Sequence, residues 1–205
     1  MTIAIIGSGN VGGALAQSCI KANHTVLMGV RLPLSDKSLK LATLIGEDRF
    51  TSVENAAKQA DVLIITTPPE AVLSVIPQLG DVRNKLIIDA TNSIRTKPDG
   101  FATAFHAIKE KTGSDLVVKC FNTTGFENLL HPVYNGEGID MFCAGDNKEA
   151  KAIAAQLAQE IGFKACYDFG GDDKVQLLEQ LALSWINLAI MQGHGRNLAF
   201  KITRR

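Results

Sequence analysis

Three glycines at a fixed spacing are the first residues in this chain that suggest a binding chemistry. They lie in "GSGNVG", directly after the apolar run Thr2–Ile6 and before a segment in which apolar residues recur at helical spacing. In this context the first glycine permits a tight turn, the second lets the backbone approach a phosphate, and the third allows the helix to pack against the strand. Free N–H groups at such a helix start bind anions. The segment predicts a dinucleotide-binding turn formed by Gly7, Ser8, Gly9, Asn10, Val11 and Gly12. The alternative is a glycine-rich turn without a ligand.

An arginine stands where a nucleotide-binding strand usually ends in an acid. Arg31 follows the predicted strand Thr25–Val30 and lies 19 residues after Gly12 (31 − 12). A carboxylate at this position binds the ribose 2′-hydroxyl of NAD, whereas a guanidinium binds a 2′-phosphate with charge-assisted hydrogen bonds and stacks on adenine. Such bonds contribute about 1.5–3 kcal/mol each. We therefore predict a roughly tenfold to hundredfold preference for NADP over NAD, with Ser35 and Lys37 in the same pocket. The alternative is a solvated loop arginine.

Small and polar residues follow three further predicted strands. Ligands of open α/β sheets bind outside the carboxyl ends of the strands. We therefore predict that the cofactor contacts two of these strand ends, Thr66, Thr67 and Pro68 in one and Ala90, Thr91 and Asn92 in the other. Asn122, Thr123 and Thr124 end the third strand and are further candidates. Turn chemistry alone also favours these residue types at such positions.

Recognisable arrangements for acid–base, nucleophilic or metal chemistry are missing from the sequence. Neither tyrosine begins a Tyr-x-x-x-Lys motif, because Gly138 and Gly171 stand four residues after Tyr134 and Tyr167. There is no Gly-x-Ser-x-Gly motif, and the four cysteines and four histidines are scattered without metal spacing. We predict no catalytic side chain and no metal. The expected chemistry is hydride transfer governed by the positioning of cofactor and acceptor.

Strands and helices are predicted to alternate along the first two thirds of the chain. This rhythm is typical of a parallel sheet with helices on both faces. The predicted strands are residues 2–6, 25–30, 61–67, 85–91 and 115–122, and the predicted helices are residues 10–22, 38–45, 70–79 and 101–111. The fold class is α/β, a Rossmann-type doubly wound parallel sheet with a small C-terminal α-helical extension. We predict an NADP-binding Rossmann domain over residues 1–145 and a C-terminal α/β and helical extension over residues 146–205.

A long helix predicted over residues 173–192 is apolar on nearly all sides. A surface helix carries one apolar stripe, so this helix needs a cover on most sides. The extension is therefore predicted to form a homodimer interface and part of the substrate site. The alternative is an internal core helix over the sheet.

Composition narrows the choice of partners. The 205 residues are 46% hydrophobic and carry 21 basic and 21 acidic side chains. This balance argues against nucleic acid as a partner, since phosphate binding needs a local excess of positive charge. No apolar run reaches about 18 residues, so no membrane span is expected. The scattered cysteines fit a reducing, cytoplasmic compartment. A small-molecule hydride acceptor or donor remains the expected partner.

Several segments occur in the same order as in a known group of oxidoreductases. They are "IAIIGSGNVG", "GVR", "ADVLIITTPP", "LIIDATN", "VVKCFNTTG" and "LSWINLAIMQGHGRNLAFKITRR". On these segments the chain resembles the NADP oxidoreductases typified by the coenzyme F420-dependent (deazaflavin-dependent) NADP reductase, and it is similar to the cytoplasmic reductase domain of the STEAP metalloreductases. The resemblance implies an NADP(H)-dependent oxidoreductase, usually dimeric, that transfers a hydride between nicotinamide and a flavin-like or deazaflavin-like ring.

The resemblance leaves the identity of the acceptor open. Coenzyme F420, FMN or FAD, and a ferric chelate are the candidates that it implies. A non-enzymatic NADP(H) sensor and an NADPH-dependent carbonyl or imine reductase remain alternatives.

Overall fold

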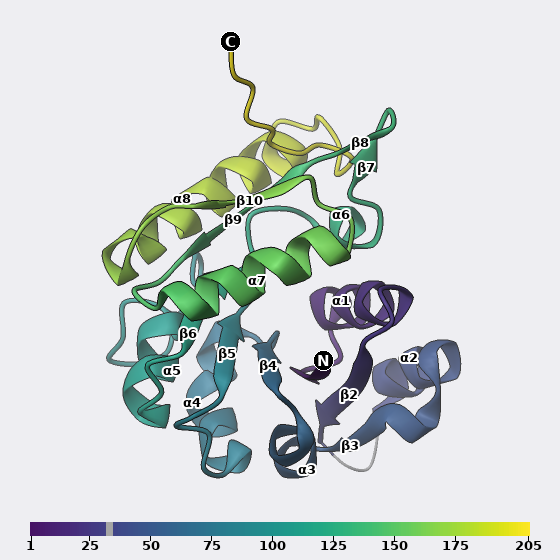
Figure 1. The fold of residues 1–205 in the computed structure, drawn as a ribbon, viewed down its shortest axis with the longest axis vertical. Helices are drawn as coiled ribbons and strands as arrows, with labels where there is room; N and C mark the ends of the chain where they lie inside the picture. Colours follow the sequence, from purple (N-terminus) through teal and green to yellow (C-terminus); the bar gives the residue numbers. More distant parts are fainter. Residues whose placement is uncertain (32–34) are drawn as a thin grey trace.

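One sheet of eight strands runs through the computed structural model, which describes residues 1–31 and 35–205 (Figure 1). The strand order is β10-β9-β6-β5-β4-β1-β2-β3, and β1 to β6 are all parallel. The order reverses between β1 and β4, the switch point at which such sheets bind ligands. The strands are β1 Thr2–Ile6, β2 Thr25–Val30, β3 Phe50–Ser52, β4 Val62–Ile65, β5 Leu86–Asp89, β6 Val117–Cys120, β9 Asp140–Ala144 and β10 Ala165–Asp168.

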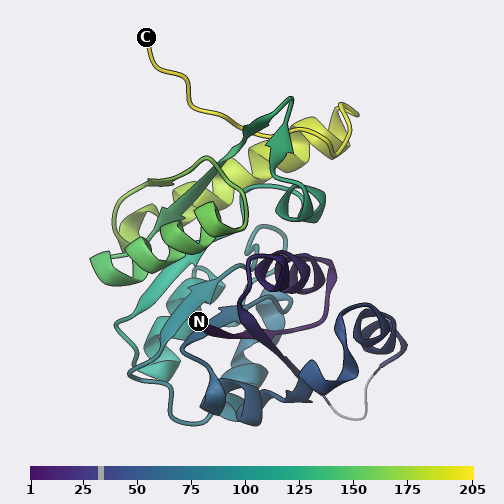
Figure 2. The same ribbon diagram turned by 45° about the vertical axis from the view of Figure 1, so that its right-hand side comes forward.

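Helices cover both faces of this sheet. The predicted α/β class, a Rossmann-type doubly wound sheet with a C-terminal helical extension, is confirmed. One hydrophobic cluster joins the sheet to α1 and α7, and the other joins it to α3, α5 and α8. In both views β9 and β10 lie between α7 and α8 (Figure 1, Figure 2). The helices are α1 Asn10–Lys21, α2 Asp36–Ile45, α3 Val53–Gln59, α4 Val72–Val75, α5 Ala104–Thr112, α6 Phe126–Leu130, α7 Lys148–Glu160 and α8 Val175–Ile186.

The central strands form where the sequence has short, continuous apolar runs. Every residue of β4, β5 and β6 is buried, as expected for parallel strands that are covered on both faces. The edge strand β3 was not predicted, because it has only three residues and all are partly exposed. Ser52 at its end caps α3, since its side chain accepts a hydrogen bond from the Asn55 amide at 3.2 Å.

The last two strands of the sheet reverse its direction. Strand β9 is antiparallel to β6, and β10 is parallel to β9. A small hairpin, β7 Val133–Tyr134 and β8 Glu137–Gly138, precedes them. The sheet thus continues past residue 145. The division of the chain there into two functional units stays a prediction.

Two of the predicted helices are interrupted. The predicted helix over residues 70–79 consists of the short α4 between two 3-10 turns, Pro69–Ala71 and Ile76–Leu79. Pro77 lacks the N–H that a continuous helix would need. The predicted helix over residues 173–192 begins as a 3-10 turn, is α-helical in α8, and ends as the π-helical turn Asn187–Met191.

Candidate functional site

The turn between β1 and α1 has the geometry that the three glycines predict. Gly7 has a φ of +115°, a region that side chains disfavour. A Cβ on Gly12 would lie 2.1 Å from the Gly7 carbonyl oxygen, so α1 packs directly on the turn. Among the described residues, no atom lies within 4 Å of the Cβ position of Gly9. This open space lies at the start of α1, where no described side chain caps the helix and the first turn has no acid. The free N–H groups there can bind an anion.

A cleft of about 570 Å³ extends from this turn along the carboxyl ends of β1, β2 and β4. It brings together eight of the residues predicted to bind the cofactor: Gly7, Ser8, Gly9, Arg31, Ser35, Thr66, Thr67 and Pro68. Arg31 is exposed, and no described side chain forms an ion pair with it. The cleft therefore joins the glycine turn to a cation that is available for an anionic group.

Three serines link the glycine turn to the start of α2. Ser38 Oγ lies 2.7 Å from Ser8 Oγ and 3.0 Å from Ser35 Oγ, and Ser35 also caps α2 by accepting from the Ser38 amide. A second helix start with its positive end therefore borders the cleft. The side chain of Lys37 lies outside the part of the chain that the structure describes, so its predicted role is not placed.

Two neighbouring threonines at the end of β4 have different roles. Thr66 Oγ1 donates to the carbonyl oxygens of Ile6 at 3.0 Å and Gly7 at 3.1 Å, so its hydroxyl holds the glycine turn. Thr67 lines the cleft, and its buried Oγ1 has no hydrogen-bond partner among the described residues. A buried polar atom without a partner is costly, and a ligand in the cleft would supply one. The cleft therefore fits the nucleotide that the glycine turn predicts.

The residues predicted at the end of β5 are divided between the core and a second cavity. Ala90 and Thr91 are both only 3% exposed, and neither lines the cleft. Asn92 lines a cavity of about 260 Å³ together with Asn10, Val11 and Asn122. The start of α1 thus borders both cavities, one along β1, β2 and β4 and the other along β5 and β6. Gly12 lies against the turn and serves packing.

Asparagines form the polar wall of this second cavity. Asn122 Nδ2 donates to Asn92 Oδ1 at 3.3 Å, while the buried Asn122 Oδ1 has no hydrogen-bond partner in the described chain. As in the first cavity, a polar atom without a partner lies at the carboxyl end of a strand. A ligand that spans both cavities would cross the carboxyl edge of the sheet.

The opposite wall of the second cavity comes from α6, α8 and the segment near the C-terminus. The Arg196 guanidinium lies 5.3 Å from the centre of the Phe126 ring and 5.4 Å from that of Trp185, and it pairs with Glu127. Trp185 Nε1 donates to the Leu198 carbonyl oxygen at 2.6 Å. The "GRN" segment, residues 195–197, therefore folds back, and its Arg196 lines the cavity. Our site prediction missed Trp185 and Arg196, although both lie in the last of the segments on which the family resemblance rests.

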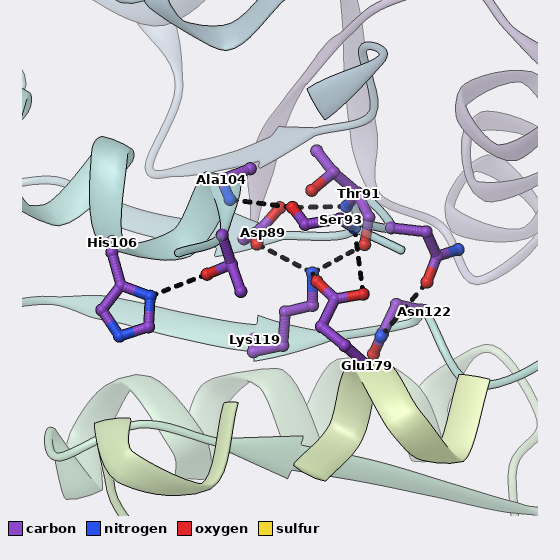
Figure 3. Close-up of polar contacts among 10 residues, drawn as sticks. Asp89, Thr91, Ser93, Ala104, His106, Lys119, Asn122 and Glu179 are labelled. Atoms are coloured by element: carbon purple, nitrogen blue, oxygen red, sulfur yellow. Dashed lines mark hydrogen bonds and ion pairs between the residues drawn. The ribbon is translucent and has the colours of Figure 1, made fainter. Parts of the chain in front are cut away.

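A buried ion cluster that we did not predict joins the ends of β5 and β6 to α8 (Figure 3). Lys119 Nζ is 2.9 Å from Asp89 Oδ2 and 2.7 Å from Glu179 Oε1, and all three side chains are almost fully buried. Burial disfavours the charge of Lys119, but the two carboxylates outweigh it and raise its pKa. Burial raises the pKa of Glu179, and the nearby Asp89 adds to this effect. The sequence carries a signal for this cluster, namely charged residues inside otherwise apolar segments. Such residues predict buried ion pairs, since Asp and Lys are almost never fully buried unless paired.

Within residues 1–31 and 35–205, no three or more His, Cys, Asp or Glu side chains are placed to hold a metal ion. No helix in these ranges is long and apolar enough to cross a membrane.

Comparisons with known proteins point to one family. Residues 2–93 match the family model described as NADP oxidoreductase coenzyme F420-dependent. The chain is 29% identical over 222 residues to the F420-dependent NADP reductase of Methanothermobacter thermautotrophicus, covering 99% of this chain and 95% of that relative. The F420-dependent NADP reductase of Methanothermobacter marburgensis is 26% identical, covering 99% and 98%. A solved structure of a candidate F420-dependent NADP reductase from Arthrobacter sp. FB24 superposes with a TM-score of 0.86 over 100% of both chains, at 22% identity, which shows a shared fold.

Proposed function

We propose that the chain, which resembles the NADP oxidoreductases described as coenzyme F420-dependent, is an NADP(H)-dependent reductase whose hydride acceptor is the deazaflavin coenzyme F420. The observation that carries the proposal is the continuous cleft from the glycine turn to Arg31. The neighbouring cavity along β5 and β6 would receive the reacting rings.

The adenosine half of the cofactor would bind in the first cavity. Free amides at the start of α1, next to the open space at Gly9, would bind the pyrophosphate. Arg31 would bind the 2′-phosphate, with Ser35 at the start of α2 beside it. Thr67 Oγ1 would gain the partner that it lacks in the described chain.

The second cavity would position the reaction without acid–base catalysis. Bound NADPH supplies a hydride from its nicotinamide ring. Among the described residues that line this cavity, one side chain is ionisable, that of Arg196. It forms an ion pair with Glu127. Asn122 Oδ1 could accept a hydrogen bond from an amide, while Trp185 and Ile186 exclude water. The protein's contribution is therefore orientation and a dry site.

A turnover screen tests the proposed activity. NADPH consumption would be followed by absorbance with coenzyme F420, FMN, a ferric chelate and a small cyclic imine as separate acceptors. We expect consumption with F420 and little with the others. Tight NADPH binding without turnover of any acceptor would instead indicate a sensor, and turnover of the imine alone would indicate an imine reductase.

Arg31 gives a prediction about cofactor choice. Because a guanidinium binds a 2′-phosphate, the protein should bind NADPH roughly ten to a hundred times more tightly than NADH. Fluorescence titration with both nucleotides measures this preference. Arg31→Asp should erase or reverse it, whereas Arg83→Ala should not change it, since Arg83 is exposed and paired with Asp81 away from the cleft. Equal affinities in the unmodified protein would refute the role of Arg31.

We also propose a homodimer formed through the outer side of α8 and the turn that follows it. Leu177 and Met191 are 52% and 57% exposed there, although the opposite side of the helix is buried. Light scattering should give about twice the chain mass of 22.0 kDa. Leu177→Glu combined with Met191→Glu should yield monomers, while Leu44→Glu on α2 should not, although Leu44 is 64% exposed. A 22.0 kDa species for the unmodified protein would refute this dimer.

We propose the cytoplasm as the location. All four cysteines are free thiols, and three of them are buried. A reducing compartment fits this state.

A further inference from the structure

The buried ion cluster holds the segment that follows β5 from several sides. Lys119 Nζ donates to the Thr91 carbonyl oxygen at 2.6 Å, and Asp89 Oδ1 accepts from the Thr91 amide at 2.9 Å. Glu179 Oε2 accepts from the Ser93 amide at 3.0 Å (Figure 3). Asn92 lies between Thr91 and Ser93 and lines the second cavity. Both neighbours of a cavity residue are therefore fixed by charged side chains.

The same cluster fixes the helix that forms the opposite wall. Glu179 lies on α8, whereas Asp89 and Lys119 lie at the ends of β5 and β6. Ala182 and Ile186 follow Glu179 by three and seven residues, which places them on the same side of the helix. Both line the second cavity. One set of ion pairs thus sets the distance between the two walls.

A stability role alone does not explain this arrangement. Burying three charged groups is costly, and well-packed apolar side chains of similar volume often stabilise a protein as well or better. The Lys119 ammonium donates hydrogen bonds to the Asp89 carboxylate and the Thr91 carbonyl oxygen. It also forms an ion pair at 2.7 Å with Glu179 Oε1, a buried oxygen that has no hydrogen-bond partner among the described residues. Such directional contacts fix geometry more sharply than apolar packing does.

We propose that Lys119 and Glu179 are positioning residues of the acceptor site. Their ion pair holds α8 against the ends of β5 and β6, so that the second cavity fits the acceptor. This inference rests on the proposed function. Neither side chain lines the second cavity. They act on it through Asn92, Ala182 and Ile186, which do line it. Loss of this ion pair should therefore weaken binding of the acceptor and leave binding of the adenosine half of NADPH unchanged, because Arg31 and the glycine turn lie along other strands.

Glu179→Gln and Glu179→Leu test this inference, with Ser184→Ala on the exposed side of α8 as the matched control. We expect the KM for coenzyme F420 to rise about tenfold in Glu179→Gln and further in Glu179→Leu, which corresponds to the loss of about 1.4 kcal/mol or more. The Kd for NADPH, measured by fluorescence, should stay within about twofold of the unmodified value. Ser184→Ala should match the unmodified protein in both quantities.

Trp185 supplies a readout that needs no acceptor. It is the only tryptophan in the chain, and it lies on α8 next to the second cavity. Its emission should shift in both Glu179 variants and not in Ser184→Ala. An unchanged emission, an unchanged KM for F420, or an equal loss of NADPH and F420 binding would each overturn the inference. If the unmodified protein bound no NADPH, the proposed function would fail, and the Trp185 emission would still decide whether the cluster places α8.

Discussion

Replacing Gly9 with alanine is expected to abolish tight NADPH binding while leaving the stability of the protein nearly unchanged. In the described chain nothing lies within 4 Å of the added Cβ, and Gly9 has a φ of −70° and a ψ of −175° that alanine adopts readily. The methyl group would instead occupy the space in front of the free amides of α1. Losing two charge-assisted bonds of about 1.5–3 kcal/mol each raises the Kd for NADPH at least about 100-fold. Fluorescence titration and thermal unfolding measure the two quantities separately.

Gly12→Ala is the matched variant with the opposite outcome. Its Cβ would lie 2.1 Å from the Gly7 carbonyl oxygen and 2.7 Å from Thr66 Oγ1, so α1 has to move away from the turn. Overpacking of this kind costs about 3 kcal/mol or more, and the melting temperature should fall by roughly 6–12 °C. If Gly9→Ala were to lose stability while keeping NADPH affinity, the assignment of this turn as the pyrophosphate site would be wrong.

Lys119→Met is expected to destabilise the fold more than any exposed substitution does. It leaves Asp89 and Glu179 buried without their cation, and breaking a buried ion pair on one side costs about 3–5 kcal/mol. For a chain of 205 residues the melting temperature should then fall by about 6–20 °C. Lys111→Met is the control, since Lys111 is exposed and its contacts in the described chain are an ion pair with its exposed neighbour Glu110 and a cation–π contact with Phe101 at 5.4 Å. A loss no larger than that of Lys111→Met would show that the cluster is not a closed ion network.

The stability deficit of Lys119→Met should depend on pH in a defined direction. The pKa of Glu179 is already raised in the unmodified protein, and removing the neighbouring cation raises it further. In the folded variant Glu179 therefore keeps a proton that it releases in the unfolded chain. The free energy of unfolding then falls as pH rises from the pKa of Glu179 in the unfolded chain, near 4.3, to its raised pKa in the folded variant. Chemical denaturation should show a smaller deficit at about pH 5 than at about pH 8. An equal deficit at both pH values would contradict this explanation.

The sequence was most informative where a local pattern alone decides the structure. Strands β1 and β2 have the predicted bounds, and the glycine turn, Arg31 and Thr67 meet at one cleft, as the carboxyl-end rule predicts. Strand β3 was missed because its three residues carry no apolar run. The interruption of the helix at Pro77 was a recognisable signal, since proline removes a backbone donor, but we did not use it.

Contacts between distant segments were beyond the reach of local patterns. Thr66 lines the cleft, so its contact with the cofactor stays a prediction, but the role of its hydroxyl in holding the glycine turn was not predicted. Ala90 and Thr91 were predicted at the ligand edge, but both are buried. Glu179 meets Lys119 only because α8 crosses the sheet, 60 residues later in the chain (179 − 119). A pattern on one segment cannot show which distant segment will face it.

The reversal of strand direction at β9 has a consequence for which loops of this protein can change. Because β9 runs opposite to β6 and β10 runs parallel to β9, the loops after β9 and β10 leave the sheet in the direction opposite to the loop after β6. Those loops are tied to each other through the Asp146 amide and the Asp172 carboxylate. The two cavities of the candidate site are thus formed without these loops. Helix α8 follows the second loop and contributes side chains to the second cavity. Insertions after Ala144 or Asp168 would lie away from both cavities of the candidate site. Loops at these two positions can therefore differ in length with little effect on catalysis.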